Sequence, residues 1–464
     1  MDKKRNYRGR GHLDQDVPSM NGNRRPPGPK GLPFLGMALE IRKDPLGTLQ
    51  RMAREYGDIV GFTALGMQRV LLSRPEYVQQ LLVLDHAKYH KSPLTKTVVG
   101  PLLGQGLLIS EGDFWRRQRR LAQPAFHRAR TNAYSPVMVE CALEHARQWR
   151  GGETRNIAEE MMKVTLEVAV RTLFGTSLAS DSENIGRATT FLMRYHLWRA
   201  RSPWRLPEFL PTPANRRARR ERSLLDSMVY RIIAERKKDA ETRNDLLTML
   251  MAAMHEDGTQ MTEQQLRDET MTLFLAGHET TALSLSWTWY LLSENPAAEA
   301  RLHEELHGVL GGRPAEVSDL EKLPYLNAVV NEGLRLYPPA HMMARTNVEP
   351  VRFGDYKIPP GPTILASQWI MQRDARFFDQ PEKFLPERWL DGLMERLPAG
   401  VYFPFGDGPR RCIGQGFAIL ETALVIAALA QKFQFRLAPG HPVVPEPLVT
   451  LRPKYGLKME IQAR

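Results

Sequence analysis

The longest helical pattern in the chain begins after Thr262 and meets no proline before Pro296. Thr262 and Gln265 form a capping-box sequence, in which each side chain satisfies a free backbone group at the start of a helix. At 1.5 Å rise per residue, the stretch predicts a helix of about 45–50 Å. Such a helix is long enough to cross a whole domain.

Other segments repeat their apolar residues with helical spacing, and a smaller part of the chain reads as strands separated by turns. Predicted helices lie at 112–121, with Asp113 as N-cap, across most of 136–235, at 296–310 and at 324–336. Predicted strands lie at 59–62 and 69–72, between 340 and 365, and from 433 to the end. The pattern predicts a mainly α fold with a smaller β-rich lobe.

Three segments have neither the helical nor the strand spacing of apolar residues. Residues 1–25 are basic and polar, which predicts a disordered tail. Residues 92–108 are rich in Gly, Leu and Val but weakly periodic, which predicts a loop apolar enough to face a cavity. Residues 202–213 contain four prolines, which predicts a hinge or lid because proline breaks helices. The basic run at 216–222 that follows is interpreted as a solvated helix face.

Composition narrows the class of protein. The 464 residues are 42% hydrophobic and 25% charged, as in a soluble globular protein. The net charge of +12 is scattered and no nucleic-acid motif accompanies it, so a nucleic-acid partner is not expected. No run of roughly 18–20 apolar residues is present and the basic N-terminus has no apolar core, so we expect a cytoplasmic protein without a stable membrane anchor.

A single cysteine near the C-terminal end stands in an unusual setting. Cys412 lies within 405–414 among three glycines and two arginines, just before the apolar helical run 417–429. A helix N-terminus and nearby arginines favour a thiolate, which acts as a metal ligand or a nucleophile. A buried structural cysteine is the alternative. The other cysteine, Cys141, lies in a helical run and is predicted to pack in the core.

A second unusual stretch, Ala276 to Thr281, lies in the middle of the long predicted helix. Glycine and threonine are poor helix formers, and such a conflict with propensity often marks a functional site. Gly277 leaves room for a flat ligand, and the Thr280 hydroxyl is able to bond back to a carbonyl and open the helix locally. An ordinary buried helix that tolerates a glycine is the alternative.

Together these motifs resemble the cytochrome P450 family. Phe405, Gly408, Arg410, Cys412 and Gly414 match the family's heme-ligating signature in residue type and spacing. The stretch 276–281 is similar to its oxygen-binding signature. The Glu332/Arg335 pair with Arg388 is similar to its Glu–Arg–Arg network, which implies a structural role. The resemblance covers 26–464, interpreted as one P450 domain whose long helix crosses the heme.

The resemblance implies a set of heme contacts. Cys412 would be the axial ligand to the iron of heme b, a thiolate donor that favours O–O cleavage in bound dioxygen. Thr280, Glu279 and Gly277 would form the catalytic group, with Glu279 feeding protons through water. The implied cofactor contacts also include Lys91, Trp115, Arg119, Arg345, Phe405, Arg410 and Gly414, with Tyr89 a weaker candidate.

The substrate side is implied to be apolar. The predicted substrate contacts are Val98, Val99, Leu102, Leu103, Phe274, Ala276, Ala340, His341, Met342, Met343, Leu448, Val449 and Thr450. The implied reaction is hydroxylation or epoxidation of a hydrophobic small molecule such as a fatty acid, terpenoid, steroid or polyketide. Dioxygen is the co-substrate.

Electrons would come from NAD(P)H through a reductase and an acidic ferredoxin or flavodoxin. Arg116, Arg117, Arg120 and Arg411 would form its docking face, or are simply solvated. We expect a monomer. Two alternatives remain open, a peroxide-driven heme-thiolate peroxygenase and a non-catalytic heme-binding sensor. The intact Glu279–Thr280 pair argues against the peroxygenase.

Overall fold

The computed structural model describes residues 24–177, 182–202, 207–238, 245–252 and 260–464. The predicted tail, 1–25, lies outside the described residues apart from its last two. The predicted lid at 202–213 lies partly outside them, because residues 203–206 are not described.

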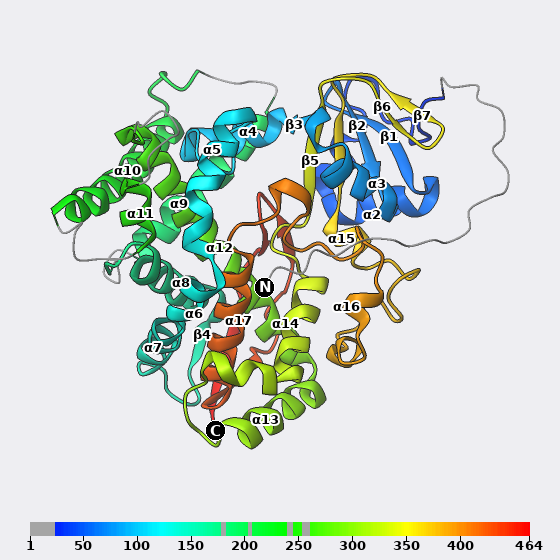
Figure 1. The fold of residues 1–464 in the computed structure, drawn as a ribbon. Helices are drawn as coiled ribbons and strands as arrows, with labels where there is room; N and C mark the ends of the chain where they lie inside the picture. The colour runs from blue at the N-terminus through cyan, green and yellow to red at the C-terminus, as the bar shows by residue number, and fades with distance from the viewer. Residues whose placement is uncertain (1–23, 178–181, 203–206, 239–244, 253–259) are drawn as a thin grey trace.

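The helical body is built around α12, Glu263–Glu294. Its 32 residues correspond to about 48 Å, and the predicted capping box between Thr262 and Gln265 is present. Figure 1 shows α12 running through the middle of the molecule, where it packs against α8 (Ile157–Leu173) and α17 (Gln415–Ala430). The long-helix prediction is confirmed.

The other predicted helices are also present. They begin where proline or an N-cap residue favours a first turn, and α13 ends at left-handed Gly311. The remaining α-helices are α1 Ala38–Lys43, α2 Pro45–Tyr56, α3 Pro75–Gln79, α4 Pro93–Leu103, α5 Gly112–Ala122, α6 Arg128–Ala133, α7 Ser135–Ala146, α9 Ser182–Arg201, α10 Pro213–Lys238, α11 Leu246–Ala252, α13 Pro296–Leu310, α14 Pro324–Leu336, α15 Gln368–Met371 and α16 Leu393–Arg396.

Short helical turns connect several of these elements. They are η1 Gln80–Leu84, η2 His86–Lys88, η3 Gln123–Phe126, η6 Val317–Lys322, η7 Pro386–Trp389 and η8 Gly408–Arg410.

The β-rich lobe lies at the upper right of Figure 1. Its five-stranded sheet has the order β1-β2-β8-β5-β3, in which β2 and β8 are parallel and the other pairs antiparallel. These strands are β1 Ile59–Ala64, β2 Met67–Leu72, β3 Tyr89–Lys91, β5 Met343–Asn347 and β8 Thr363–Ala366. The two strands predicted at 59–62 and 69–72 are confirmed, and they pair as an antiparallel hairpin.

Smaller sheets complete the described β structure. Their orders are β4-β12-β9, β10-β11 and β6-β7. The strands are β4 Thr154–Asn156, β6 Val351–Phe353, β7 Tyr356–Ile358, β9 Phe433–Leu437, β10 Pro445–Pro447, β11 Leu451–Pro453 and β12 Lys458–Ala463. The main apolar core surrounds α12 and α17, and two smaller clusters lie in the β-rich lobe.

Two local predictions are wrong. Residues 93–103 form α4 and not a loop, because Ser92 caps the helix by accepting from the Thr95 N–H and Pro93 fits the first turn. Asp113 does not cap α5, since the N-cap position belongs to Glu111. The Glu111 carboxylate accepts instead from the Lys91 backbone N–H at 2.5 Å. Within the described residues, no helix is long and apolar enough to cross a membrane.

Candidate active site

The cysteine loop, residues 405–414, turns at two glycines in the left-handed backbone region. Gly406 and Gly408 have φ of +69° and +67°. The Cys412 N–H donates to the Phe405 carbonyl at 2.9 Å, which closes the loop just before α17 begins. Cys412 is accessible to solvent, whereas Cys141 is buried in the core as predicted.

Protein atoms crowded around Cys412 affect its ionisation. Although the residue is accessible, these atoms displace water around the thiol and raise the pKa of Cys412, while the Gly414 N–H, Arg119 and Arg411 lower it and only partly offset the increase. Arg119 is fixed beside the loop because its guanidinium donates to the Arg411 carbonyl at 2.8 Å. The predicted stabilisers of a thiolate are therefore present, but they do not outweigh the effect of the surrounding protein atoms. A bound metal cation would favour the thiolate.

Substitution of Gly408 tests the geometry of this loop. An alanine Cβ at Gly408 would lie 2.1 Å from the Leu82 carbonyl oxygen, in a backbone conformation that favours glycine. We expect Gly408→Ala to lower the free energy of unfolding by roughly 3 kcal/mol or more. Chemical denaturation measures the loss.

Gly416→Ala is the matched control, since nothing lies within 4 Å of a Cβ there and the residue is helical. It should be neutral or stabilising by roughly 0.5–1 kcal/mol. Equal stability of the two variants would contradict the loop geometry.

The middle of α12 presents one accessible patch on an otherwise buried helix. Between Leu266 and Trp289, every residue is buried except Ala276, Gly277 and Thr280. These three share one helical face, and the Thr280 hydroxyl donates to the Ala276 carbonyl at 2.7 Å, as the sequence predicts.

Gly277 has more space around it than Gly408 of the cysteine loop. A Cβ there would meet Leu173 and Ala169 of α8 at 3.8 and 4.0 Å, which are ordinary contacts. Packing within the protein therefore does not require glycine at this position. The accessible face is consistent with a flat ligand lying over it.

Glu279 is not a free acid. Its carboxylate forms an ion pair with Arg452 of β11 at 2.8 Å and accepts from the Thr450 hydroxyl. Arg452 also donates to the Thr190 hydroxyl of α9 at 2.7 Å. Burial alone would raise the pKa of Glu279, but Arg452 and Thr450 outweigh it and the pKa is lowered.

The prediction missed Arg452 and misplaced Thr450. Thr450 binds the carboxylate of Glu279, so its hydroxyl is not a free substrate contact. The only sequence signal for Arg452 was an arginine in a mostly apolar strand.

Arg452→Met tests this ion pair. Removal of the guanidinium leaves a buried carboxylate, which is expected to cost about 3–5 kcal/mol near neutral pH. Because the folded pKa of Glu279 is lowered, its contribution to stability is present above the unfolded carboxyl pKa and is lost as pH falls through the folded value. The difference between wild type and variant should therefore shrink in acid. Denaturant titrations at several pH values measure the free energy of unfolding of both proteins. A difference between them that does not change with pH would contradict a stabilising Glu279–Arg452 ion pair.

Three cations converge on one carboxylate beside the cysteine loop. Arg410 donates to Glu111 at 2.5 Å and stacks over the Trp115 ring at 3.8 Å, while Arg345 pairs in the sheet with Lys91. Burial lowers the pKa of Lys91, Arg345 and Arg410, and the two arginines further lower that of Lys91. Glu111 is the single acid acting on all three.

Lys96 also lies 3.8 Å from the Glu111 carboxylate, so four basic side chains share this one acid. A heme brings two propionates, which need cationic donors. The residues present therefore fit the group that the resemblance implies. Of the other predicted contacts, Phe405 packs against the main core, and Gly414 lies beside the Phe126 ring. Tyr89 is buried in a core cluster of the β-rich lobe.

Most of the predicted substrate contacts pack in the apolar clusters of the described structure. Val98, Val99, Leu102 and Leu103 are buried in the main core, because α4 packs against α9 and α12. Phe274 packs against Phe174 and His278, on a face of α12 different from that of Ala276 and Thr280. The sequence indicated that these residues are apolar but not which way they point, and their role as substrate contacts stays a prediction.

The remaining substrate candidates are dispersed. Met342 and Met343 pack against the two clusters of the β-rich lobe, and Leu448 and Val449 against the main core. Ala340 is half-buried, and the backbone carbonyl of His341 accepts from the Ser367 hydroxyl at 3.0 Å.

A cavity of about 650 Å³ lies between α4, α5 and α12. It is lined by charged and polar side chains beside apolar ones: Lys96, Gly100, Pro101, Gly104, Gln105, Ile109, Glu111, Phe114 and Asp268.

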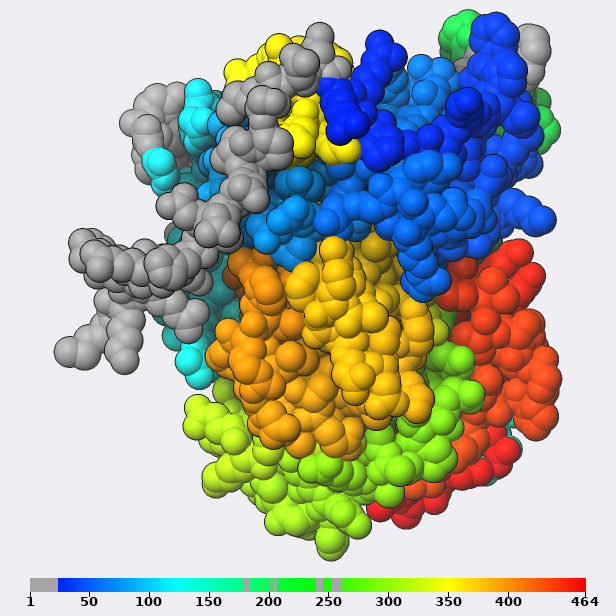
Figure 2. All heavy atoms as spheres, turned by 90° about the vertical axis from the view of Figure 1, so that its right-hand side faces the viewer, coloured from blue at the N-terminus to red at the C-terminus, as the bar shows by residue number. Residues whose placement is uncertain are grey.

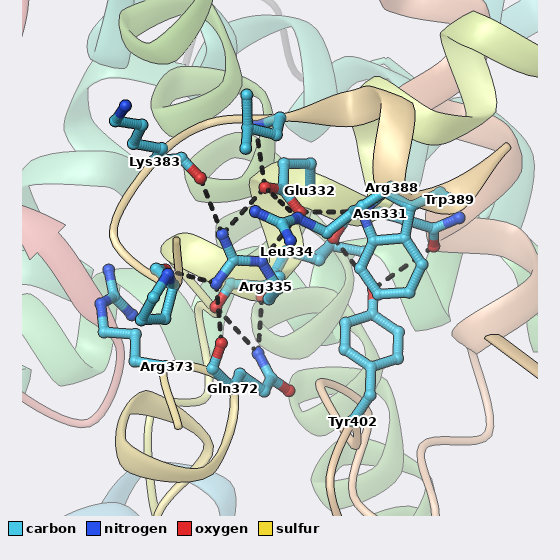
Figure 3. Close-up of polar contacts among 12 residues, drawn as sticks. Asn331, Glu332, Leu334, Arg335, Gln372, Arg373, Lys383, Arg388, Trp389 and Tyr402 are labelled. Atoms are coloured by element: carbon cyan, nitrogen blue, oxygen red, sulfur yellow. Dashed lines mark hydrogen bonds and ion pairs between the residues drawn. The ribbon is translucent and has the colours of Figure 1, made fainter. Parts of the chain in front are cut away.

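A buried ion-pair network lies beside the site (Figure 3). Glu332 and Arg335 of α14 are completely buried and form two hydrogen bonds of 2.8 Å. Glu332 also accepts from Arg388 at 3.0 Å, from the Trp389 indole at 2.8 Å and from the Leu385 N–H at 2.9 Å. The structure thus brings together the three residues assigned to this network, and adds Trp389.

The network extends towards the cysteine loop. Arg335 donates to the carbonyls of Gln372, Pro381 and Lys383 at 2.8, 2.6 and 2.9 Å. The Gln372 side chain in turn accepts from the Phe403 N–H at 3.2 Å. Phe403 precedes the cysteine loop by two residues, so a continuous chain of hydrogen bonds joins α14 to that loop (Figure 3 shows its α14 end).

The predicted docking face is exposed beside the same loop. Arg116, Arg117, Arg120 and Arg411 are all exposed. Arg116 forms an ion pair with Asp113 at 2.5 Å, and Arg411 donates to Gln415 at 2.6 Å.

The chain is similar to known proteins of one family along most of its length. A family model described as Cytochrome P450 matches residues 26–459. Cyclooctatin synthase of Streptomyces melanosporofaciens is 38% identical over 91% of this chain and 92% of its own length. Cyclooctat-9-en-7-ol 5-monooxygenase of the same organism is 34% identical over 89% and 90%. Pentalenene oxygenase of Streptomyces avermitilis is 30% identical over 94% and 97%.

The fold has a counterpart among solved structures. Retinoic acid bound cyanobacterial CYP120A1 superposes with a TM-score of 0.84 and 26% identity, covering 96% of this chain and all of that one. The predicted mainly α fold with a β-rich lobe is confirmed. With its cysteine loop, the accessible face of α12 and the family match across almost the whole length, the chain belongs to the cytochrome P450 family and is a monooxygenase of that family.

Proposed function

We propose that this P450 monooxygenase hydroxylates or epoxidises a terpenoid. The observation that carries the proposal is the similarity to cyclooctatin synthase, cyclooctat-9-en-7-ol 5-monooxygenase and pentalenene oxygenase along most of their lengths. Fatty acids, steroids and polyketides, the other classes that the sequence allowed, have no such support among these relatives. Family membership supports an enzyme and argues against a non-catalytic sensor.

The protein's own residues divide the work of holding heme b. Cys412 would hold the heme iron through its sulfur, and Lys91, Arg345 and Arg410 would bind the propionates, with Trp115 stacked on Arg410. When bound, the thiolate-ligated heme supplies activation of dioxygen. The hydrogen-bonded chain from Glu332 to Phe403 would hold the cysteine loop in place.

Thr280 and Glu279 have different roles in this proposal. The Thr280 hydroxyl, on the accessible face of α12, would hold a proton near the oxygen-binding face. Glu279 is held as a carboxylate by Arg452 and must leave this ion pair, or pass protons through Thr450, to deliver one. Arg452 is therefore a positioning residue.

The exposed arginines beside the cysteine loop support docking of an acidic ferredoxin or flavodoxin, because opposite charges steer association. Electrons would come from NAD(P)H through a reductase. Salt should slow this electron transfer, since charges on exposed surfaces are screened.

A substrate-binding assay tests the substrate class. Terpenoid hydrocarbons and alcohols, with fatty acids, steroids and polyketides as comparison sets, are titrated into the holoprotein and the low-spin to high-spin shift is recorded. We expect a saturable shift with terpenoids. A shift with only one of the other sets would overturn the proposed substrate while leaving the monooxygenase class intact.

Thr280→Ala should reduce product formation by roughly 100-fold, because a positioned proton donor contributes about that much. Heme content and the spin shift should not change. Thr280→Ser, which keeps the hydroxyl, is the matched control and should retain most turnover. Peroxide-driven activity of wild type equal to that with the redox chain, together with full turnover in Thr280→Ala, would instead indicate a peroxygenase.

A further inference from the structure

An exposed group of large apolar side chains lies at the N-terminal end of the described chain. We call it the N-terminal apolar patch; it consists of Leu32, Phe34, Leu35, Leu39, Leu65 and Met67. Backbone bonds hold its two segments together, since the Leu65 N–H donates to the Leu35 carbonyl at 3.1 Å and the Met37 N–H to the Thr63 carbonyl at 2.7 Å. In Figure 2 these dark-blue and blue segments lie at the upper surface of the molecule.

Two residues of the patch have unfavourable backbone conformations. Phe34 and Leu65 have φ of +58° and +52°, and Gln380 is the only other non-glycine residue with positive φ in the described chain. This conformation costs an L-residue roughly 1 kcal/mol or more, and glycine would avoid the cost. Phe34 is nevertheless 94% exposed, so burial within the protein does not explain its side chain.

The surrounding charge is strongly positive. Residues 24–43 contain five cations and one acid, a net charge of +4. The cations are Arg24, Arg25, Lys30, Arg42 and Lys43, and all are exposed. The single acid, Glu40, is paired with Arg51 of α2, which leaves the five cations without a matching acid in this segment.

We propose that the N-terminal apolar patch docks this protein on the surface of a bilayer that contains anionic phospholipid. Exposed apolar side chains enter the boundary between headgroups and acyl chains, and adjacent cations attract anionic headgroups. A second copy of the chain fits less well, because symmetric pairing of the patch would bring the five cations of each copy together. The contact is peripheral, with the side chain of Phe34 as its apolar anchor.

The proposal is independent of the substrate class. It is tested by sedimentation of the full-length holoprotein with phosphatidylcholine vesicles and with vesicles in which part of the lipid is phosphatidylglycerol. We expect binding to the anionic vesicles that weakens at high salt, and little binding to the neutral ones. Phe34→Gly should lower the partition coefficient roughly tenfold, because it removes one large apolar side chain from the interface.

The same variant separates binding from folding. Glycine accommodates the positive φ of Phe34, so the thermal midpoint of Phe34→Gly should equal or exceed that of wild type. Leu84→Ser is the matched control, because Leu84 is 75% exposed but lies outside the patch beside Asp85; it should bind like wild type.

Absence of wild-type binding to anionic vesicles would overturn the proposal, as would equal binding by Phe34→Gly. A concentration-dependent dimer in vesicle-free sedimentation velocity that Phe34→Gly abolishes would instead assign the patch to a second copy of the chain.

Discussion

Cys412→Ser is expected to abolish the carbon monoxide difference band of a thiolate-bound heme and to reduce turnover to background. Serine has nearly the shape of cysteine, so the loop closed by the Cys412 N–H and the Phe405 carbonyl should remain. What is lost is the soft sulfur donor, on which the electronic properties of the group depend. Spectra of the reduced protein under carbon monoxide and product assays measure the two effects.

Cys141→Ser is the matched control for this substitution. Cys141 is buried in the main core, and burial raises the pKa of its thiol to about 12, so it is a neutral packing group. Its replacement should cost roughly 1 kcal/mol of stability and leave the difference band intact. If Cys412→Ser retained both band and turnover, the assignment of Cys412 as the metal ligand would be wrong.

Glu332→Ala is expected to prevent accumulation of folded protein. Arg335 is completely buried, and loss of the carboxylate would leave its charge uncompensated at a cost of about 3–5 kcal/mol. The bonds from Arg388, Trp389 and Leu385 to the same carboxylate would also be lost. Folded proteins are more stable than their unfolded chains by about 5–15 kcal/mol, so the loss of the Glu332 carboxylate would remove a large fraction of the total stability. Soluble yield and the denaturant midpoint measure it.

Glu76→Ala provides a matched control at an exposed ion pair. Glu76 pairs with Arg74 at 3.0 Å, and the two side chains are 69% and 49% exposed, so the pair should contribute at most about 1 kcal/mol. Comparable stability of the two variants would show that the buried network is not the main support of the cysteine loop.

The motifs that identify this protein are short and local. Residues 405–414 contain two left-handed glycines and end at the N-cap of α17, so spacing alone specifies the turn that presents Cys412. The same is true of the Thr280 back-bond to Ala276, which spans one helical turn, and of the Glu332–Arg335 pair. The boundaries of α12, α13 and α14 follow from their caps and prolines.

The sequence was a poor guide where the outcome depended on the direction of a side chain or on packing between helices. The sequence of 92–108 has weak periodicity, yet α4 forms because its apolar residues are buried against neighbouring helices. The resemblance implied that Phe274 lines the pocket together with Ala276, but a two-residue displacement on a helix rotates a side chain by about 200°. It contacts Phe174 instead.

By itself, the sequence determined the family, the cysteine loop, the long capped helix and the mixed α and β architecture, because each depends on residues a few positions apart. Only the tertiary structure decided what surrounds the site. Arg452 reaches Glu279 across 173 positions, and Arg410 reaches Glu111 across 299. Such pairs leave no local pattern, since their partners meet only after the helices and sheets have packed.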